Sequence, residues 1–266
     1  MAQVKPKKAL GQHFLTDTDI ARRIADTLLP YKGLRVVEVG PGMGVLTRFL
    51  LEAGHDVTVI EIDHESVEYL KNRFPQLESE GRIIEGDFLT TDLNELFPGP
   101  EPICVIGNYP YNISSQIFFH ILDFKDRVVC CSGMLQKEVA ERITAPEGNK
   151  TRGILSVLLQ AWYNAEYLFT VSEHVFNPPP KVKSGVIRLV RNDVTDLGTD
   201  PRLFKQVVKT TFGQRRKMLR SSLRPLWGTA TPPPTDHPLL SMRPEQLSVA
   251  QFIELTNLVA STRRQQ

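Results

Sequence analysis

The sequence lacks any long apolar run. No stretch of its 266 residues approaches the roughly 18 consecutive apolar residues that a membrane-spanning helix needs. The N-terminal segment "MAQVKPKKAL" is basic but has no apolar core, so we do not interpret it as a secretory signal. With 41% hydrophobic and 23% charged residues, the composition predicts a globular protein that buries a substantial core.

Cysteine is also scarce. The three residues, Cys104, Cys130 and Cys131, are odd in number and have no CxxC spacing. This pattern argues against a disulfide framework and against a zinc site, and two of the thiols lie side by side in an apolar run. We therefore predict buried thiols, a reducing cytoplasm and no metal site.

The net charge is only +2, but it is unevenly distributed. Residues 1–180 hold 17 Lys and Arg against 24 Asp and Glu, whereas residues 181–266 hold 15 against 6. An acidic body with a basic C-terminal segment indicates a polyanionic partner for that segment, with nucleic acid the obvious one. Ordinary solvated surface charge is the alternative.

Short apolar runs rich in β-branched residues alternate with segments of helical periodicity, which predicts an α/β fold with a mainly parallel sheet covered on both faces. We expect a catalytic domain over residues 1–191, including a basic arm and closing loop at 1–16, and a small helical domain over 192–266. The predicted strands are 35–39, 57–62, 82–84, 103–107, 127–131, 166–171 and 186–190, and the later helices 153–163, 202–226 and 244–260.

The first strand ends in a glycine turn, "VGPGMG", which contains Gly40. Glycines there permit a tight turn and a close approach of the backbone to a ligand, although steric needs alone also place glycine in such turns. Glu61, 21 positions after Gly40, ends the next strand and is placed to accept hydrogen bonds from ribose hydroxyls. Asp87 ends the third strand and is placed to accept from an adenine amino group.

These strand ends fit either a dinucleotide or S-adenosylmethionine. A pyrophosphate favours cations, but the glycine turn holds no Lys or Arg and acids follow it, which suits the sulfonium and ammonium of S-adenosylmethionine better. Two further acids, Glu38 and Asp63, are interpreted mainly as solvated residues or helix caps.

The fourth strand ends in "NYPY", residues 108–111. The side-chain carbonyl of Asn108 and the main-chain carbonyl of Tyr109 could accept both hydrogens of an exocyclic adenine amine, which would localise its lone pair for attack. Pro110 stiffens the turn, and Tyr111 offers a ring on which a flipped base could stack. Phe176, just before a proline run, is a candidate for the opposite face of the base, with an ordinary core role as the alternative.

Together these residues resemble the KsgA-type small-subunit ribosomal RNA adenine-N6,N6 dimethyltransferases. The similarity runs through "KKALGQHFLTD", "EVGPGMGVLT", "VIEID", "EGDFL", "GNYPYNIS", "MLQKEVAERI", "FNPPPKVKSGVIRL" and "TFGQRRKMLRSSL". The resemblance implies a Rossmann-like class I methyltransferase sheet with helices on both faces, followed by a small C-terminal all-α domain. It also implies S-adenosylmethionine as the methyl donor.

By the same resemblance, individual positions take roles in the site. The donor would contact His13, Leu15, Gly40, Glu61, Asp87 and Asn108, while Asn108, Tyr109, Pro110 and Tyr111 would form the catalytic turn and Tyr111 and Phe176 the base-stacking pair. Two positions depart from the family, which often has Asn at position 13 and Leu or Ile at position 109. The first departure bears on whether the side chain or the backbone of residue 13 contacts the donor.

The implied reaction is dimethylation of two adjacent adenosines in the 3′-terminal hairpin loop of small-subunit rRNA, on an assembling subunit. The basic segments fit such a partner, and we expect those near residue 215 to lie partly around one helix. The candidate RNA-binding residues are Lys5, Lys7, Lys8, Arg215, Arg216, Lys217 and Arg220.

Other functions stay open from the residues alone. The closest alternative is a large-subunit rRNA adenine dimethyltransferase of the macrolide-resistance type, which shares fold and chemistry. A non-catalytic ribosome-assembly or nucleic-acid-binding factor on the same fold is a second. A DNA adenine methyltransferase fits less well, since no separate sequence-reading domain is apparent. We expect a monomer.

Overall fold

The computed structural model describes residues 4–7, 10–227 and 236–264, which form two compact units. The first unit comprises Met1–Ala140 and Ala165–Arg191, and the second comprises Glu141–Asn164 and Asn192–Gln266. One junction between the two units falls between residues 191 and 192. The segment 141–164 differs, because it belongs to the helical unit and not to the sheet-containing one.

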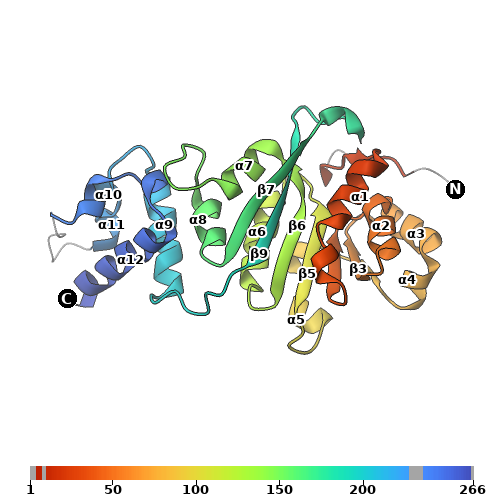
Figure 1. Cartoon of the computed structure of the whole chain (residues 1–266), viewed down its shortest axis with the longest axis horizontal. Helices are drawn as coiled ribbons and strands as arrows, with labels where there is room; N and C mark the ends of the chain where they lie inside the picture. Colours follow the sequence, from red (N-terminus) through yellow and green to blue (C-terminus); the bar gives the residue numbers. More distant parts are fainter. Residues whose placement is uncertain (1–3, 8–9, 228–235, 265–266) are drawn as a thin grey trace. The chain divides into compact units, whose positions relative to one another are not determined.

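The first unit is built on a sheet in which seven strands of the described residues run in the order β4-β3-β2-β5-β6-β9-β7 (Figure 1). From β4 to β6 neighbouring strands pair in parallel, and β9 then pairs antiparallel to β6. The strands are β2 (Arg35–Val39), β3 (Asp56–Glu61), β4 (Ile83–Glu85), β5 (Ile103–Asn108), β6 (Val128–Gln136), β7 (Tyr163–Val171) and β9 (Ser184–Arg191). The predicted parallel α/β sheet is confirmed.

These segments become strands because both faces of the central ones are covered. In β2 and β5 the apolar side chains are almost fully buried on either face, which explains the continuous apolar runs in the sequence. The three cysteines lie in β5 and β6 and are buried and free, as predicted. A two-stranded pairing of β1 (Phe14–Leu15) with β8 (Phe176–Asn177) ties the N-terminal segment to the chain just before β9.

Helices connect the strands of the first unit. They are α1 (Thr18–Asp26), α2 (Val45–Glu52), α3 (His64–Arg73), α4 (Pro75–Ser79), α5 (Leu93–Leu96) and α6 (Ser114–Asp123), with 3-10 turns η2 (Leu29–Tyr31), η3 (Phe88–Thr90) and η4 (Glu173–Val175). Asp17 and Asp63 accept hydrogen bonds from the first backbone N–H groups of α1 and α3 and so cap both helices. The cap interpretation of Asp63 is confirmed.

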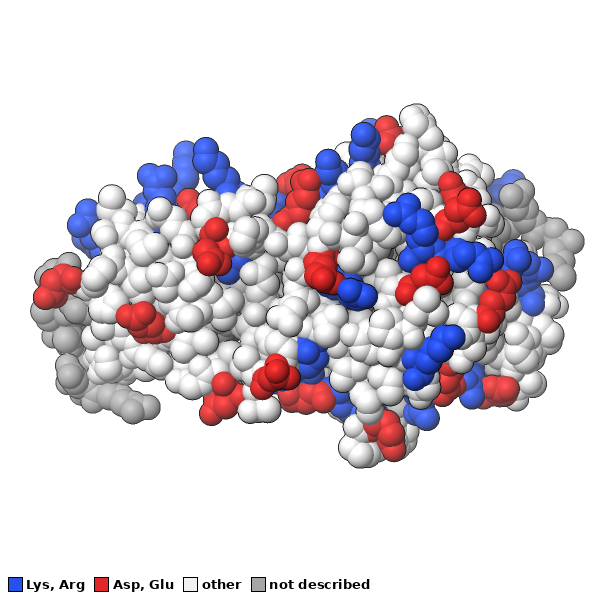
Figure 2. Space-filling view, viewed as in Figure 1, with Lys and Arg blue, Asp and Glu red and all other residues white. Residues whose placement is uncertain are grey.

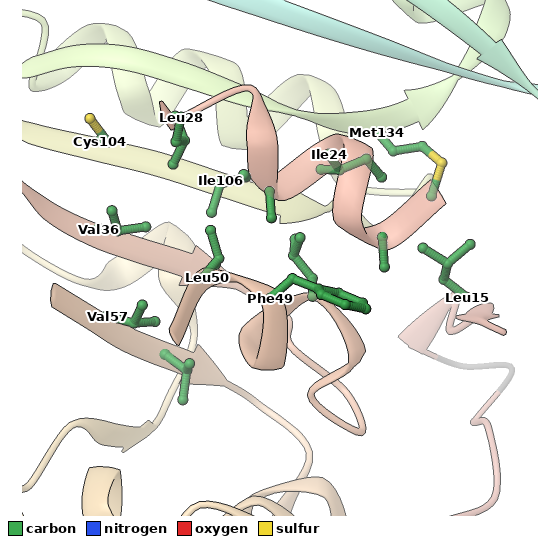
Figure 3. Packing of buried hydrophobic residues seen from close by; sticks show 14 of the residues in the cluster. Leu15, Ile24, Leu28, Val36, Phe49, Leu50, Val57, Cys104, Ile106 and Met134 are labelled. Atoms are coloured by element: carbon green, nitrogen blue, oxygen red, sulfur yellow. The ribbon is translucent and has the colours of Figure 1, made fainter. Parts of the chain in front are cut away.

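A hydrophobic core lies between α1, α2 and the sheet, where α1 and α2 pack side by side (Figure 3). Ile24 and Leu28 from α1 and its end, Leu50 from α2 and Ile106 from β5 point toward one another in this layer and are fully buried. This packing holds α1 and α2 against one face of the sheet, and the glycine turn leads from β2 into α2.

The second unit is helical. Its elements are the end of α7 (Lys137–Thr144), α8 (Ile154–Gln160), α9 (Pro201–Gly213), α10 (Leu219–Ser222), α11 (Arg224–Trp227), η5 (Pro238–Ser241), η6 (Pro244–Gln246) and α12 (Val249–Arg264). The loop before α8 is fixed by the buried Arg152, whose guanidinium donates to Ala145 O at 2.6 Å and to Gln160 Oε1 at 2.7 Å. Gly148 N–H donates to Glu245 O, so this loop packs within the helical unit.

The expectation of one helix over 202–226 is wrong. Helix α9 ends at Gly213, and a turn follows in which Lys217 N–H donates to Gln214 O before α10 begins at Leu219. Glycine is a poor helix former, and the four residues after Gly213 are all polar, so they do not continue the apolar face that α9 buries. The basic run therefore lies in a turn and short helices, not around one helix.

Candidate active site

A cavity of about 200 Å³ lies in the first unit at the carboxyl ends of β2, β3, β4 and β5. The N-terminal segment 10–15 and the turn after β5 complete its wall. Ligands of open α/β sheets collect at this edge of the sheet. Nine of the predicted site residues line the cavity. They are His13, Leu15, Gly40, Glu61 and Asp87 of the predicted donor site, and Asn108, Tyr109, Pro110 and Tyr111 of the predicted catalytic turn.

The glycine turn after β2 is shaped by positive φ angles that other residues rarely adopt. Gly40 has φ of 64° and Gly42 has φ of 56°. A Cβ atom on Gly42 would also lie 2.9 Å from the ring of Phe14, which lines the cavity. The N–H of Gly42 donates to Glu61 Oε2 at 3.0 Å, so the end of β3 holds the turn in place. The turn thus presents bare backbone to the cavity.

Two buried carboxyl groups face the cavity from adjacent strands. Glu61, at the end of β3, accepts from the N–H groups of Gly42 and Asp63, and burial raises the pKa of its carboxyl. Glu38, on β2, is only 1% exposed and accepts from Thr47 Oγ1 of α2 at 2.6 Å. The expectation that Glu38 is solvated is therefore wrong. Its partner Thr47 gave no recognisable signal in the sequence.

Asp87 is the N-cap residue of η3, and its Oδ1 atom accepts a hydrogen bond from Leu89 N–H at 2.9 Å. Asp87 both caps η3 and lines the cavity, so a role as a helix cap is compatible with a role in ligand binding at this position. No Lys or Arg is found among the described residues that line the cavity. The cavity wall is apolar surface interrupted by acids, amides and backbone groups.

Asn108 ends β5 with its amide held in one orientation. The Nδ2 atom donates to the main-chain oxygen of His13 at 3.1 Å, which leaves the Oδ1 atom as the free acceptor. Next to it, the Tyr109 side chain turns inward, is 1% exposed and donates from its hydroxyl to Ser132 O at 2.8 Å. The Tyr109 side chain thus points away from the cavity, and a role for its main-chain carbonyl stays a prediction.

Tyr111 is half-buried, and its hydroxyl is hydrogen-bonded to Ser184 at the start of β9. The His13 ring stacks on it with centroids 5.5 Å apart and an interplanar angle of 29°. His13 Nδ1 donates to Pro178 O at 2.8 Å, since a carbonyl oxygen can only accept. His13 therefore connects the N-terminal segment, Tyr111 and the proline run through its side chain as well as its backbone.

Phe176 occupies a different environment from the other predicted site residues. It pairs with Leu15 in the β1–β8 ladder, is 4% exposed and belongs to the hydrophobic core. It is not among the residues that line the cavity. The structure thus gives Phe176 a core role, and its stacking role stays a prediction.

The candidate RNA-binding residues either have partners within the protein, have exposed side chains, or lie outside the described residues. Lys7 Nζ lies 2.5 Å from Asp63 Oδ1 and 3.2 Å from Glu65, so its charge is engaged at the start of α3. Arg215, in the second unit, donates to Lys150 O and lies 3.9 Å from Glu245. Those with exposed side chains are Lys5, Arg216, Lys217 and Arg220, and Lys8 lies outside the described residues.

Basic and acidic side chains are interspersed over α1 and α2 on the face shown in Figure 2. Glu52, for example, lies 2.7 Å from Arg48 and 3.6 Å from Arg22. Charges paired in this way create little field at a distance, so this face is a poor candidate for a polyanion.

Comparison with known proteins agrees with this geometry. The family described as "Ribosomal RNA adenine dimethylase" matches residues 3–261. A protein of Parabacteroides distasonis named "Ribosomal RNA small subunit methyltransferase A" is 66% identical over 96% of this chain and 94% of its own length. A protein of the same name from Porphyromonas gingivalis is 63% identical over 97% of this chain and 99% of its own length.

Two solved structures have a similar architecture. A dimethyladenosine transferase from Plasmodium falciparum superposes with a TM-score of 0.75 at 23% identity, covering 94% of this chain and 98% of the other. The 23S rRNA methyltransferase ErmE superposes with a TM-score of 0.64 at 26% identity, covering 92% and 99%. Both share the fold of this chain along almost its whole length.

Proposed function

Because the chain belongs to the ribosomal RNA adenine dimethylase family, we propose that it dimethylates N6 of two adjacent adenosines in the 3′-terminal hairpin loop of small-subunit rRNA. The protein is an S-adenosylmethionine-dependent methyltransferase with a class I, Rossmann-like sheet. The small subunit is favoured over the large one because the relatives at 60–66% identity carry the small-subunit name. ErmE, named for 23S rRNA, is 26% identical.

The cavity fits the proposed donor. S-adenosylmethionine carries a sulfonium and an ammonium group, and it meets the carboxyl groups of Glu38, Glu61 and Asp87 with no lining Lys or Arg among the described residues. The bare backbone of Gly40 and Gly42 gives room for a ligand against the turn. When bound, the donor supplies an electrophilic methyl group on a positively charged sulfur. We assign Glu61 to the ribose and Asp87 to the adenine.

The orientation of Asn108 is the observation that carries the proposal. With its Nδ2 committed to His13 O, the Oδ1 atom can accept one hydrogen of the target amine, and Tyr109 O can accept the other. Two acceptors pull the amine nitrogen out of conjugation with the adenine ring and localise its lone pair. Pro110 and the buried Tyr109 ring fix the turn, so the gain comes from positioning and not from an ionisable base.

Recognition of the RNA is assigned to stacking and to exposed cations. Tyr111 offers a ring held at its hydroxyl by Ser184, on which a flipped adenine can stack for about 1–3 kcal/mol. In the second unit, the exposed Arg216, Lys217 and Arg220 are proposed to contact phosphates. In the described residues no helix is long and apolar enough to cross a membrane. We propose a monomer that acts on the assembling small subunit in the cytoplasm.

The test is transfer of tritiated methyl groups from S-adenosylmethionine. Small subunits that lack the dimethyladenosines, large subunits that lack their own adenine methylation and naked DNA are offered in parallel, and the labelled nucleoside is identified. Label in N6,N6-dimethyladenosine of small-subunit RNA is expected, and Asn108→Ala should abolish it, whereas Asn72→Ala on an exposed face of α3 should not. Label only in large subunits would favour a resistance-type enzyme, and none in any substrate a binding factor.

A further inference from the structure

Glu38 is a buried carboxyl group to which the proposed function gives no individual role. Its side chain lines the donor cavity, it is 1% exposed, and its Oε2 accepts from the hydroxyl of the fully buried Thr47. In the described residues no Lys, Arg or His lies within ion-pair distance of it. A carboxylate taken out of water without a cation is costly, so such a group is stable mainly in its neutral form.

The titratable groups around Glu38 further favour the neutral form of its carboxyl group. From β3, the carboxyl of Glu61 faces the same cavity, and Asp87 lines it from the end of β4. His13 lines it from the N-terminal segment, whereas Arg48 of α2 points away to Glu52. Asn108 lines the cavity from the end of β5 and does not titrate, and burial raises the pKa of Tyr109 and Tyr111 in the turn after it, so the charged residues among those lining the cavity are acids.

Burial raises the pKa of both carboxyl groups, and Glu38, 1% exposed against 4% for Glu61, is the more deeply buried of the two. Glu61 accepts from the N–H groups of Gly42 and Asp63, which stabilise its charged form. For Glu38, burial raises the pKa to about 8, and the nearby Glu61 adds to this effect, while hydrogen bonds from Thr47 oppose it. Near neutral pH the free protein therefore keeps Glu38 mostly protonated.

We propose that Glu38 is the residue through which the cavity distinguishes the methyl donor from the spent product. In the free protein Glu38 is neutral, and it gives up its proton to solvent when the cationic donor binds. Methyl transfer forms a bond from the amine nitrogen to the methyl carbon, and the electrons of the broken carbon–sulfur bond stay on sulfur. The amine loses a proton to solvent, the sulfonium charge is gone, and Glu38 takes a proton back from solvent.

This exchange favours product release. S-adenosylhomocysteine carries one positive charge less than S-adenosylmethionine, so it compensates an ionised Glu38 less well. The inference rests on the proposed use of S-adenosylmethionine and deepens it. It also gives a role to an acid at the cavity wall, where an amide could accept from Thr47 equally well.

Calorimetric titration of the full chain with S-adenosylmethionine tests the exchange directly. Heats measured in two buffers of different ionisation enthalpy give the number of protons released on binding. The protein should release protons on donor binding at pH 7 and fewer at pH 9, because burial raises the pKa of Glu38 to about 8. S-adenosylhomocysteine should release less than half as much as the donor at pH 7.

Two variants separate this role from a structural one. Glu38→Gln keeps an acceptor for Thr47 but cannot ionise, so the proton release at pH 7 should disappear and the preference for donor over product should fall about tenfold. Thr47→Val removes a hydrogen bond that favours the charged form, so more protons should be released at pH 9 than by the unmodified protein. Thermal melting confirms that each variant is folded.

Failure of the role proposed for Glu38 and failure of the proposed function give different results in these experiments. No binding of S-adenosylmethionine by the unmodified protein would overturn both proposals. Binding accompanied by equal proton release in the unmodified protein and Glu38→Gln would overturn only the role of Glu38. Equal release by donor and product would also overturn it, because the sulfonium charge would then play no part.

Discussion

Replacing Asn108 by alanine removes the side chain that we propose accepts a hydrogen bond from the target amine. The amide bond to His13 O, 3.1 Å long and half-buried, contributes on the order of 1 kcal/mol to stability. For a chain of this size that loss lowers the melting temperature by about 2–4 °C. A preorganised acceptor at a reacting group is worth about 3 kcal/mol in the transition state, so the rate of methyl transfer should fall about 10²–10³-fold.

Asn108→Asp tests whether an acceptor oxygen at this position is sufficient, or whether the hydrogen bond to His13 O that orients it is also needed. Aspartate keeps an oxygen at the position of Oδ1 but, when ionised, has no hydrogen to donate to His13 O. Its carboxylate would be repelled by that carbonyl and would turn away from the productive position. We expect a loss of about tenfold or more, which corresponds to roughly one hydrogen bond.

The assay is single-turnover methyl transfer to undermethylated small subunits at saturating donor, with calorimetric donor binding measured alongside. Asn72→Ala provides the matched control, because it removes an amide from an exposed position of α3. If Asn108→Ala transferred methyl groups within threefold of the unmodified rate, the acceptor mechanism would be refuted. A fall in melting temperature above about 10 °C would instead assign the loss to misfolding.

Other predictions concern the segments around the site. Tyr111→Phe should retain most activity because the stacking ring is kept, while Tyr111→Ala should raise KM for the subunit at least tenfold in steady-state assays. Lys7→Met should weaken donor binding in calorimetry, because the ion pair of Lys7 with Asp63 fixes the N-terminal segment next to the cavity. The salt dependence of subunit binding should not change, because the charge of Lys7 is already paired. Arg216→Ala should weaken subunit binding and lower its salt slope in filter binding, whereas Arg215→Ala should chiefly lower the melting temperature, since Arg215 has intramolecular partners.

Local patterns in the sequence predicted the sheet and the order of the strand ends well. The strands are short, continuous apolar runs because both faces are buried, and the carboxyl ends of parallel strands necessarily meet at one edge. Placing Gly40, Glu61, Asp87 and Asn108 in one cavity follows from that topology. No long-range contact had to be known for this part of the site.

Contacts between distant segments could not be predicted in the same way. Tyr111 meets Ser184, 73 positions further along the chain, and Lys7 meets Asp63, 56 positions away. A basic residue near the N-terminus is equally consistent with an RNA contact until its partner is known. Glu38 differs, because it lies within the continuous apolar run of β2 and is enclosed by the burial of both faces of that strand.

His13 shows how the site can differ from the family pattern without losing its geometry. Its main-chain oxygen receives the amide of Asn108, and any residue at position 13 would supply that oxygen. Its ring packs on Tyr111 and donates to Pro178 O, a pair of contacts that depends on an imidazole. The backbone of His13 thus orients the amide of Asn108, while its side chain covers one face of the Tyr111 ring and ties the N-terminal segment to Pro178. Asparagine in related proteins is compatible with the first role, so the substitution affects how Tyr111 is covered and not how Asn108 is held.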